Sequence, residues 1–185
     1  MKTLVIYGSP QKNSYTKKLL DKTLKNIEGE IKFLDCYNSK IVPCKDCKYC
    51  FHQSGCSIND DMTEIYDYIY DCDAVVIATP MHFGIPSAPV VTFFSRLQPY
   101  WSNEFIRKNE EDKPKRKKAI LLATTGADWP NIELMMDGVS AVAFNHMNAD
   151  FIGSIYAKDT ENKAIDGNEE IENKIEIFTE ALNKK

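Results

Sequence analysis

The stretch KTLVIYGSPQKNSYT, residues 2–16, contains a strand, a turn and the start of a helix. Residues 2–7 form a short apolar run with β-branched members, which predicts a buried strand. A Gly-Ser-Pro turn ends that run. Residues 14–27 then carry apolar side chains at positions i, i+4 and i+7, which predicts a helix with one buried face.

The same order of strand, turn and helix recurs along the chain. Apolar runs predict buried strands at 74–79 and 119–124, and we expect further strands at 30–35 and 150–157. Apolar residues at helical spacing predict helices at 61–70, 87–101, 133–147 and 169–182. Two segments have no sustained period, and we expect a loop at 36–60 and an exposed connection at 103–117.

Strands that are apolar throughout and alternate with helices indicate a parallel sheet covered on both faces. Five such units match the flavodoxin-like strand order 2-1-3-4-5. The sequence therefore predicts an α/β fold, a doubly wound five-stranded parallel sheet. We expect one domain over residues 1–185, with a cysteine-rich loop at 36–60 inserted after the second strand.

The composition narrows the class of function. The 185 residues carry a net charge of −4, which gives no overall attraction to nucleic acid or to an anionic membrane surface. No apolar stretch approaches the roughly 20 residues that span a bilayer, and the N-terminal apolar run is too short for a secretory signal. We expect a cytoplasmic protein with reduced thiols, so the six cysteines need a role other than disulfides.

The loop after the first strand has the features of a phosphate site. Hydroxyls of Ser9, Ser14 and Thr16 and the amide of Asn13 lie at the start of a helix, whose free N–H groups suit an anion. Helix capping by Asn13 or Ser14 is the alternative explanation. Because the ATP-type and dinucleotide-type glycine motifs are both absent, a mononucleotide phosphate is the expected ligand.

Two motifs resemble those of the NADPH-dependent FMN reductase and iron–sulfur flavoprotein family: G-S-P-x-x-x-S-x-T at 8–16 and A-T-P-M-H-F-G-I-P-S-A at 78–88. The resemblance covers nearly the whole chain and implies bound FMN. Its phosphate would lie on Ser9, Ser14, Tyr15 and Thr16, and its ring on residues 80–84. The full set of implied FMN contacts is Ser9, Gln11, Asn13, Ser14, Tyr15, Thr16, Pro80, Met81, His82, Phe83, Gly84, Thr124, Thr125 and Gly126. Gln11 stands where many relatives carry arginine, which puts one charged contact in doubt.

Residues 80–86 combine two prolines and a glycine, so we expect a rigid turn that offers apolar contact and backbone N–H groups to a flavin ring. No catalytic residue is assigned with certainty, because the chemistry resides on the flavin. His82 is either a proton donor or an ordinary hydrogen-bonding residue. Trp101 and Trp129 either cap the flavin, within one chain or across a dimer, or are ordinary core or interface aromatics.

Four cysteines, Cys44, Cys47, Cys50 and Cys56, have the spacing C-x2-C-x2-C-x5-C. Four thiolates suit a [4Fe–4S] cluster or a structural zinc. The spacing is similar to the compact motif of iron–sulfur flavoproteins, which implies a [4Fe–4S] cluster. A similar segment also occurs in cluster-free reductases, so cluster, zinc and free thiols all stay open. We expect Cys36 and Cys72 to be packing thiols.

Two charged segments have structural explanations. Asp60 and Asp61 stand at the start of a predicted helix and are expected to cap it. The basic run at 113–118 is expected to be a solvated loop, with attraction of an anionic partner as the alternative.

The resemblance implies an FMN-dependent oxidoreductase. The donor would be NAD(P)H or a ferredoxin-like protein, and the acceptor a quinone, another small molecule or the cluster. The alternatives are a cluster-free NAD(P)H:FMN or quinone reductase, and a non-enzymatic flavodoxin-like electron carrier or redox sensor. The family resemblance also implies a homodimer or homotetramer.

Overall fold

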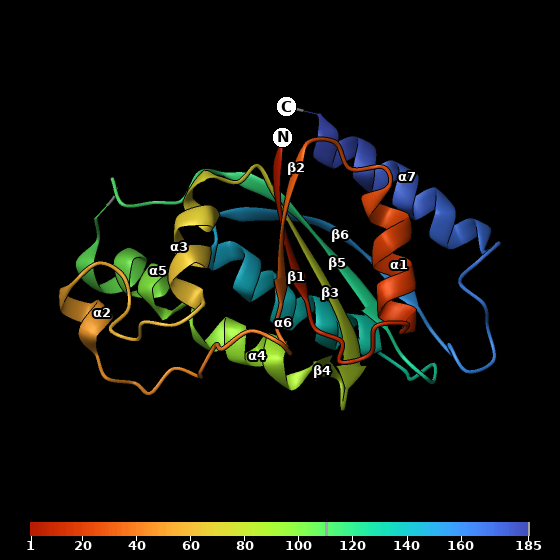
Figure 1. Cartoon of the computed structure of the whole chain (residues 1–185), viewed down its shortest axis with the longest axis horizontal. Helices are drawn as coiled ribbons and strands as arrows, with labels where there is room; N and C mark the ends of the chain where they lie inside the picture. The colour runs from red at the N-terminus through yellow and green to blue at the C-terminus, as the bar shows by residue number, and fades with distance from the viewer. Residues whose placement is uncertain (110, 185) are drawn as a thin grey trace.

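Five parallel strands form the central sheet of this computed structural model, which describes residues 1–109 and 111–184. They lie in the order β2-β1-β3-β5-β6 (Figure 1). Their bounds are β1 (Lys2–Tyr7), β2 (Glu30–Asp35), β3 (Ala74–His82), β5 (Lys117–Thr124) and β6 (Ala149–Ala157). Counted along the chain, this is the predicted order 2-1-3-4-5, so the predicted fold is confirmed. The short β4 (Ile85–Pro86) pairs antiparallel with the end of β3 and was not predicted.

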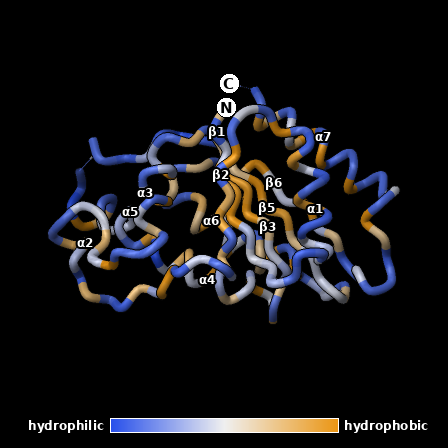
Figure 2. The backbone as a smooth tube through the Cα atoms, viewed as in Figure 1, coloured by the Kyte–Doolittle hydropathy of each residue, from blue (hydrophilic) through white to orange (hydrophobic). Residues whose placement is uncertain are grey.

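Helices cover both faces of the sheet (Figure 1). One face carries α1 (Tyr15–Leu24) and α7 (Glu169–Asn183); the other carries α3 (Met62–Asp71), α4 (Ala88–Ser95) and α6 (Ile132–His146). The strands supply both cores by alternation, so Leu4 and Ile6 pack against the second group of helices while Val5 packs against the first. Figure 2 shows the resulting apolar centre of the sheet.

The predicted helix at 87–101 is broken in two. It consists of α4 and of α5 (Gln98–Ser102), separated by Arg96 and Leu97, whose ψ angles are near zero. Pro99 explains the break, because proline has no N–H with which to continue the helical hydrogen bonds. The predicted helix at 14–27 also ends earlier, at Leu24.

The two predicted connections contain structure of their own. The segment at 36–60, called the cysteine segment from here on, includes the short helix α2 (Tyr49–His52) and lies beyond α3 and α4 (Figure 1). The connection at 103–117 begins with a π-helical turn, η1 (Asn103–Arg107), and its first residue, Asn103, is buried rather than exposed.

The basic run at 113–118 is not a free loop. Lys115 pairs with Asp73 and Arg116 with Asp150. Lys117 is buried at the start of β5, where its Nζ donates to the carbonyl oxygens of Lys115 and Met147. The expectation of a solvated loop was therefore wrong for the end of this run.

The strand register brings three loops to one edge of the sheet. Tyr7 at the end of β1 pairs with Ala78 in β3, and Pro80 in β3 pairs with Thr124 at the end of β5. The loops that follow these positions therefore meet at the carboxyl edge, where open α/β sheets bind ligands. No helix in the described part of the chain is long and apolar enough to cross a membrane.

Candidate functional site

A pocket of about 280 Å³ opens at the carboxyl edge of the sheet, between three loops. The first loop follows β1, the second comprises the last residues of β3 (80–82) with the hairpin after them, and the third follows β5. The lining residues are Ser9, Pro10, Gln11, Ser14, Tyr15, Thr16, Pro80, Met81, His82, Thr124, Thr125, Gly126 and Thr160. The pocket thus brings together most of the FMN contacts predicted from the sequence. Asn13, Phe83 and Gly84 do not line it, while Pro10 and Thr160 were missed.

Tyr7 holds the first loop in place by hydrogen bonds. Its hydroxyl donates to the carbonyl of Gln11 at 3.0 Å and lies 3.1 Å from the Ser14 hydroxyl. Ser14 caps α1, because its Oγ accepts the N–H of Lys17 at 3.0 Å. Since Tyr7 has already given its proton to Gln11, Ser14 donates to Tyr7, and a phosphate would compete for that proton.

The start of α1 lies at the pocket, which Tyr15 and Thr16 line. Tyr15 and Thr16 are the first helical residues, and N–H groups at these positions have no partner within a helix. They also lie at the positive end of the helix dipole. The capping explanation of Ser14 and the phosphate explanation of the loop are therefore compatible.

Ser87 locks the first loop to the second. Its Oγ donates to the carbonyl of Gly8 at 2.7 Å, and its backbone N–H donates to Oγ1 of Thr79 at 3.0 Å. Gly8 fits only without a side chain, because an added Cβ would lie 2.2 Å from a methyl carbon of Val90. These buried contacts fix the distance between two walls of the pocket.

The third loop is tied to both of its neighbours. Oγ1 of Thr124 lies 2.6 Å from Oγ1 of Thr16, and both side chains are buried. Thr160, which follows β6, donates from its N–H and its hydroxyl to the carbonyl of Thr125 at 3.1 and 3.2 Å. No local pattern indicates Thr160, because its position depends on how the chain after β6 folds back.

A tight hairpin ends the second loop. Phe83 and Gly84 both have positive φ, 53° and 83°, and connect β3 to β4 as a two-residue turn. The Phe83 ring is fully exposed, and Gly84 is buried beside Met135. His82 is exposed at the rim of the pocket. The turn predicted at 80–86 is therefore present, but its aromatic tip lies outside the pocket.

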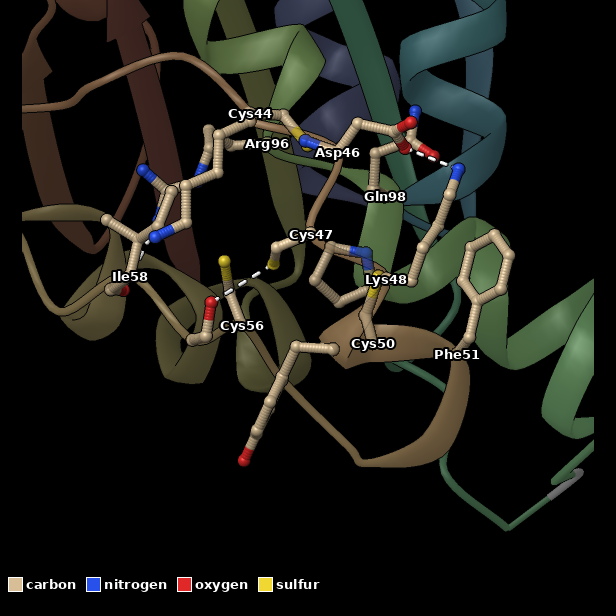
Figure 3. A pocket seen from close by; sticks show the side chains of 14 residues that line it. Cys44, Asp46, Cys47, Lys48, Cys50, Phe51, Cys56, Ile58, Arg96 and Gln98 are labelled. Atoms are coloured by element: carbon tan, nitrogen blue, oxygen red, sulfur yellow. Dashed lines mark hydrogen bonds and ion pairs between the residues drawn. The ribbon is translucent and has the colours of Figure 1, made fainter.

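All four clustered cysteines line a second, small cavity of about 20 Å³ (Figure 3). In this arrangement their sulfur atoms have other partners: Cys47 Sγ lies 3.2 Å from the Ser57 hydroxyl, and Cys50 Sγ lies 3.2 Å from the Ser102 hydroxyl. The hydrogen bond with Ser57 lowers the pKa of the exposed Cys47 thiol. Across residues 1–109 and 111–184, no three His, Cys, Asp or Glu side chains converge to hold a metal ion.

Arg96, which follows α4, forms one wall of that cavity (Figure 3). Its guanidinium is fully buried and forms a bidentate pair with Asp60 at 2.6 and 3.2 Å. Burial alone would raise the pKa of the Asp60 carboxyl, but hydrogen bonds from Arg96 and from backbone N–H groups hold that pKa below its usual value. Asp60 Oδ1 also accepts the N–H of Met62, the first residue of α3, at 3.0 Å, so Asp60 bonds to the helix start as predicted. Asp61 makes no side-chain capping bond.

The remaining cysteines and the tryptophans lie away from the first pocket. Cys36 and Cys72 are buried, and burial raises the pKa of their thiols to about 12 and about 11. Trp101 contacts Phe51 of the cysteine segment, with ring centres 6.0 Å apart. Trp129 is exposed after the third loop and does not line the pocket.

The sequence of this chain matches a known protein family. The sequence of residues 1–162 matches the family model of NADPH-dependent FMN reductases. An iron-sulfur flavoprotein of Archaeoglobus fulgidus is 34% identical over 103 residues, which cover 54% of this chain and 47% of the relative. An iron-sulfur flavoprotein of Methanosarcina thermophila is 31% identical over 115 residues, which cover 60% and 59%. The match therefore spans about half the length of these relatives.

Solved structures agree on the fold. A flavone reductase superimposes with a TM-score of 0.74 at 18% identity, over the whole of this chain and 62% of its own. An NAD(P)H:quinone oxidoreductase of Methanothermobacter marburgensis gives a TM-score of 0.69 at 13% identity, covering 100% and 94%. At such identities the likeness establishes the fold alone. The family match, which extends over most of the sequence, shows that the chain belongs to the NADPH-dependent FMN reductase family.

Proposed function

We propose that this protein is an FMN-dependent oxidoreductase that accepts electrons from NAD(P)H or a ferredoxin-type donor and passes them to a quinone or another small acceptor. One observation carries the proposal: three loops from separate strands line a single pocket, and most of their lining residues are the FMN contacts implied by the sequence motifs. Bound FMN would supply hydride acceptance and electron donation.

The residues of the pocket suit the two ends of FMN. The N–H groups at the start of α1 and the hydroxyl of Ser9 are donors for the phosphate. Pro80 and Met81 line the pocket and offer apolar contact to the ring. Gln11 lines the pocket as a neutral side chain, so the helix N-terminus carries the electrostatic part of phosphate binding.

We further propose that Cys44, Cys47, Cys50 and Cys56 hold a [4Fe–4S] cluster. Their donor set is complete, and all four line one cavity. To ligate a cluster, Cys47 and Cys50 would exchange their contacts with Ser57 and Ser102 for the metal. The relatives named iron-sulfur flavoproteins support this assignment.

One helix links the two sites. Ser87 before α4 binds the first and second loops of the flavin pocket, whereas Ser95 at its end accepts the N–H of Cys44 at 3.1 Å. Eight helical residues rise about 12 Å. The two proposed redox sites are therefore attached to opposite ends of one rigid helix.

A cluster-free NAD(P)H:FMN or quinone reductase is the second candidate. The observation in its favour is that three of the four thiols bond to a hydroxyl or to a backbone N–H, and that no three of them converge within the described residues. In that case the cysteines would be free thiols on a loop that α4, α5 and η1 already hold.

A homo-oligomer is also expected. The outer face of α6 exposes Leu134, Val139 and Val142, with 75%, 38% and 61% of their surfaces accessible. Apolar side chains aligned on one exposed helix favour burial against a second copy. Light scattering on the purified protein measures the mass directly.

Flavin titration, metal analysis and stopped-flow mixing test the proposal. Protein stripped of flavin should take up one FMN per chain, and protein prepared without oxygen should contain stoichiometric iron and sulfide. Mixing with NADH or NADPH should bleach the flavin absorbance. Absence of flavin uptake would refute the whole proposal, and flavin uptake without iron would leave the cluster-free reductase. Flavin that is not reduced by either nucleotide would indicate a ferredoxin-type donor or an electron carrier.

A further inference from the structure

Arg96 binds the cysteine segment on both sides of the four cysteines. Its Nη1 donates to the carbonyl of Val42 at 2.8 Å, just before Cys44, and its Nη2 lies 3.4 Å from the carbonyl of Ile58, just after Cys56. The pair with Asp60 adds a third attachment. One buried side chain thus joins the two arms that carry the first and last of the four cysteines.

The remaining donor of Arg96 has no partner among residues 1–109 and 111–184. Its Nε has no hydrogen bond and is shielded from solvent, because Arg96 as a whole is only 1% exposed. A buried N–H that is left unpaired loses its hydrogen bond to water without a replacement, and native proteins rarely keep one without a reason. This arginine lines the same cavity as the four thiols (Figure 3).

We propose that Arg96 is the positioning residue of the four-cysteine site: it sets the spacing of the two arms and presents its charge and its free Nε–H to the thiolates of a bound cluster. The inference rests on the proposed cluster. Hydrogen bonds and charge near cluster sulfurs are among the main determinants of a cluster's reduction potential. Because the reduced cluster is more negative, a nearby positive charge favours reduction and raises the potential.

Asp60 provides a test of the sign of this effect. Its carboxylate offsets part of the Arg96 charge, so Asp60→Asn leaves the guanidinium in place and uncompensated. The cluster potential should then become more positive. Adding Arg96→Gln to Asp60→Asn removes the positive charge without leaving a buried carboxylate alone, and the potential should fall below that of Asp60→Asn. A merely structural role predicts no such reversal.

Arg107 supplies the matched control. Its guanidinium also binds the cysteine segment, at the carbonyls of Cys50 and Gln53, but Arg107 does not line the cavity. Arg107→Lys should therefore leave the cluster potential at the wild-type value. The FMN potential, recorded in the same titration, should be equal in all variants.

The experiment is a potentiometric titration of anaerobically prepared wild type, Asp60→Asn, Asp60→Asn/Arg96→Gln and Arg107→Lys, with iron, sulfide and FMN measured on each. The proposal is supported if, at constant FMN content, the cluster potential rises in Asp60→Asn and falls again when Arg96→Gln is added. Selective loss of iron from the Arg96 variant, with FMN retained, also supports it, because the arms then no longer hold their spacing.

Two results would overturn the inference. If Asp60→Asn and the double variant have the same potential at full iron content, the Arg96 charge does not act on the cluster. If the cluster potentials of Asp60→Asn, the double variant and Arg107→Lys all move from the wild-type value in the same direction and by the same amount, the effect is general loosening of the segment. Wild-type protein that binds FMN but takes up no iron or sulfide fails earlier and separately, because it refutes the cluster of the proposed function itself.

Discussion

The hydroxyls of Thr16 and Thr124 lie 2.6 Å apart although the two residues are 108 positions apart in the chain. Thr16 lies in the first turn of α1 and Thr124 ends β5, so this one contact joins the phosphate side of the proposed flavin pocket to its third loop. Both side chains are buried, and each hydroxyl is the other's partner across the wall of the pocket.

We expect Thr16→Val and Thr124→Val each to lower the free energy of unfolding by about 1–3 kcal/mol, because each leaves one buried hydroxyl unpaired. The double variant should lose less than the sum of the two, since it removes both polar groups. Urea unfolding of the four proteins gives the double-mutant cycle. Additive losses would mean that the two hydroxyls do not bond to each other.

Gly8 should not tolerate a side chain. In Gly8→Ala the new Cβ would lie 2.2 Å from Val90 and 2.7 Å from the Ser87 hydroxyl, which would force the first loop away from the second. We expect a loss of about 1–3 kcal/mol in stability, as is usual for overpacking, and at least tenfold weaker FMN binding. Isothermal titration with FMN and thermal unfolding measure the two effects.

Gly138→Ala is the matched control for that substitution. An added Cβ at Gly138 meets no atom within 4 Å, and the residue lies on the exposed side of α6. Because alanine favours a helix over glycine, stability should rise by about 0.5–1 kcal/mol with FMN affinity unchanged. Equal damage by both substitutions would contradict the packing explanation for Gly8.

The strand order and the meeting of the three loops were predictable from the sequence. Residues 4–7, 74–78 and 119–123 are apolar at every position, and such runs indicate strands buried in a parallel sheet. Once the order is known, the loops after β1, β3 and β5 must share one edge. The contacts that we propose for a flavin on those loops therefore follow from connectivity rather than from side-chain detail.

Other features depend on contacts that no local pattern contains. Arg96 occupies a helical run in which arginine is expected to face solvent, yet it is buried because Asp60 and the carbonyl oxygens of the cysteine segment surround it. Thr160 reaches the pocket only because the chain after β6 returns to the third loop. By contrast, Pro99 did carry a local signal for the helix break that the spacing of apolar residues concealed.

Alkylation should distinguish the two classes of cysteine. In iron-free protein Cys47 is exposed, whereas Cys36 and Cys72 are buried. We expect iodoacetamide to label Cys47 first and to label Cys36 and Cys72 only in urea, because burial blocks access and raises the pKa of both thiols. Peptide mass spectrometry after timed quenching ranks the sites.

Loading with iron and sulfide gives the matching control. If Cys47 is a ligand, its labelling should stop after reconstitution, while Cys36 and Cys72 stay unreactive as before. Unchanged labelling of Cys47 in protein that contains stoichiometric iron would show that this thiol is not bound to the cluster.

Lys117 should make stability depend on pH in the alkaline range. Burial lowers the pKa of its ammonium group from 10.5 to about 8. Between these values the unfolded chain holds a proton that the folded chain has released, so the free energy of unfolding rises with pH across this window. Each unit of pKa difference corresponds to about 1.4 kcal/mol.

In Lys117→Met this group is absent, and the stability difference between the variant and the wild type should shift in favour of the wild type from about pH 8 to 10.5. Urea unfolding of both proteins at intervals across that range measures the difference, in which titration of other lysines and of tyrosines cancels. Parallel curves for the two proteins would mean that the ammonium of Lys117 remains charged in the fold, fully compensated by the carbonyl oxygens of Lys115 and Met147.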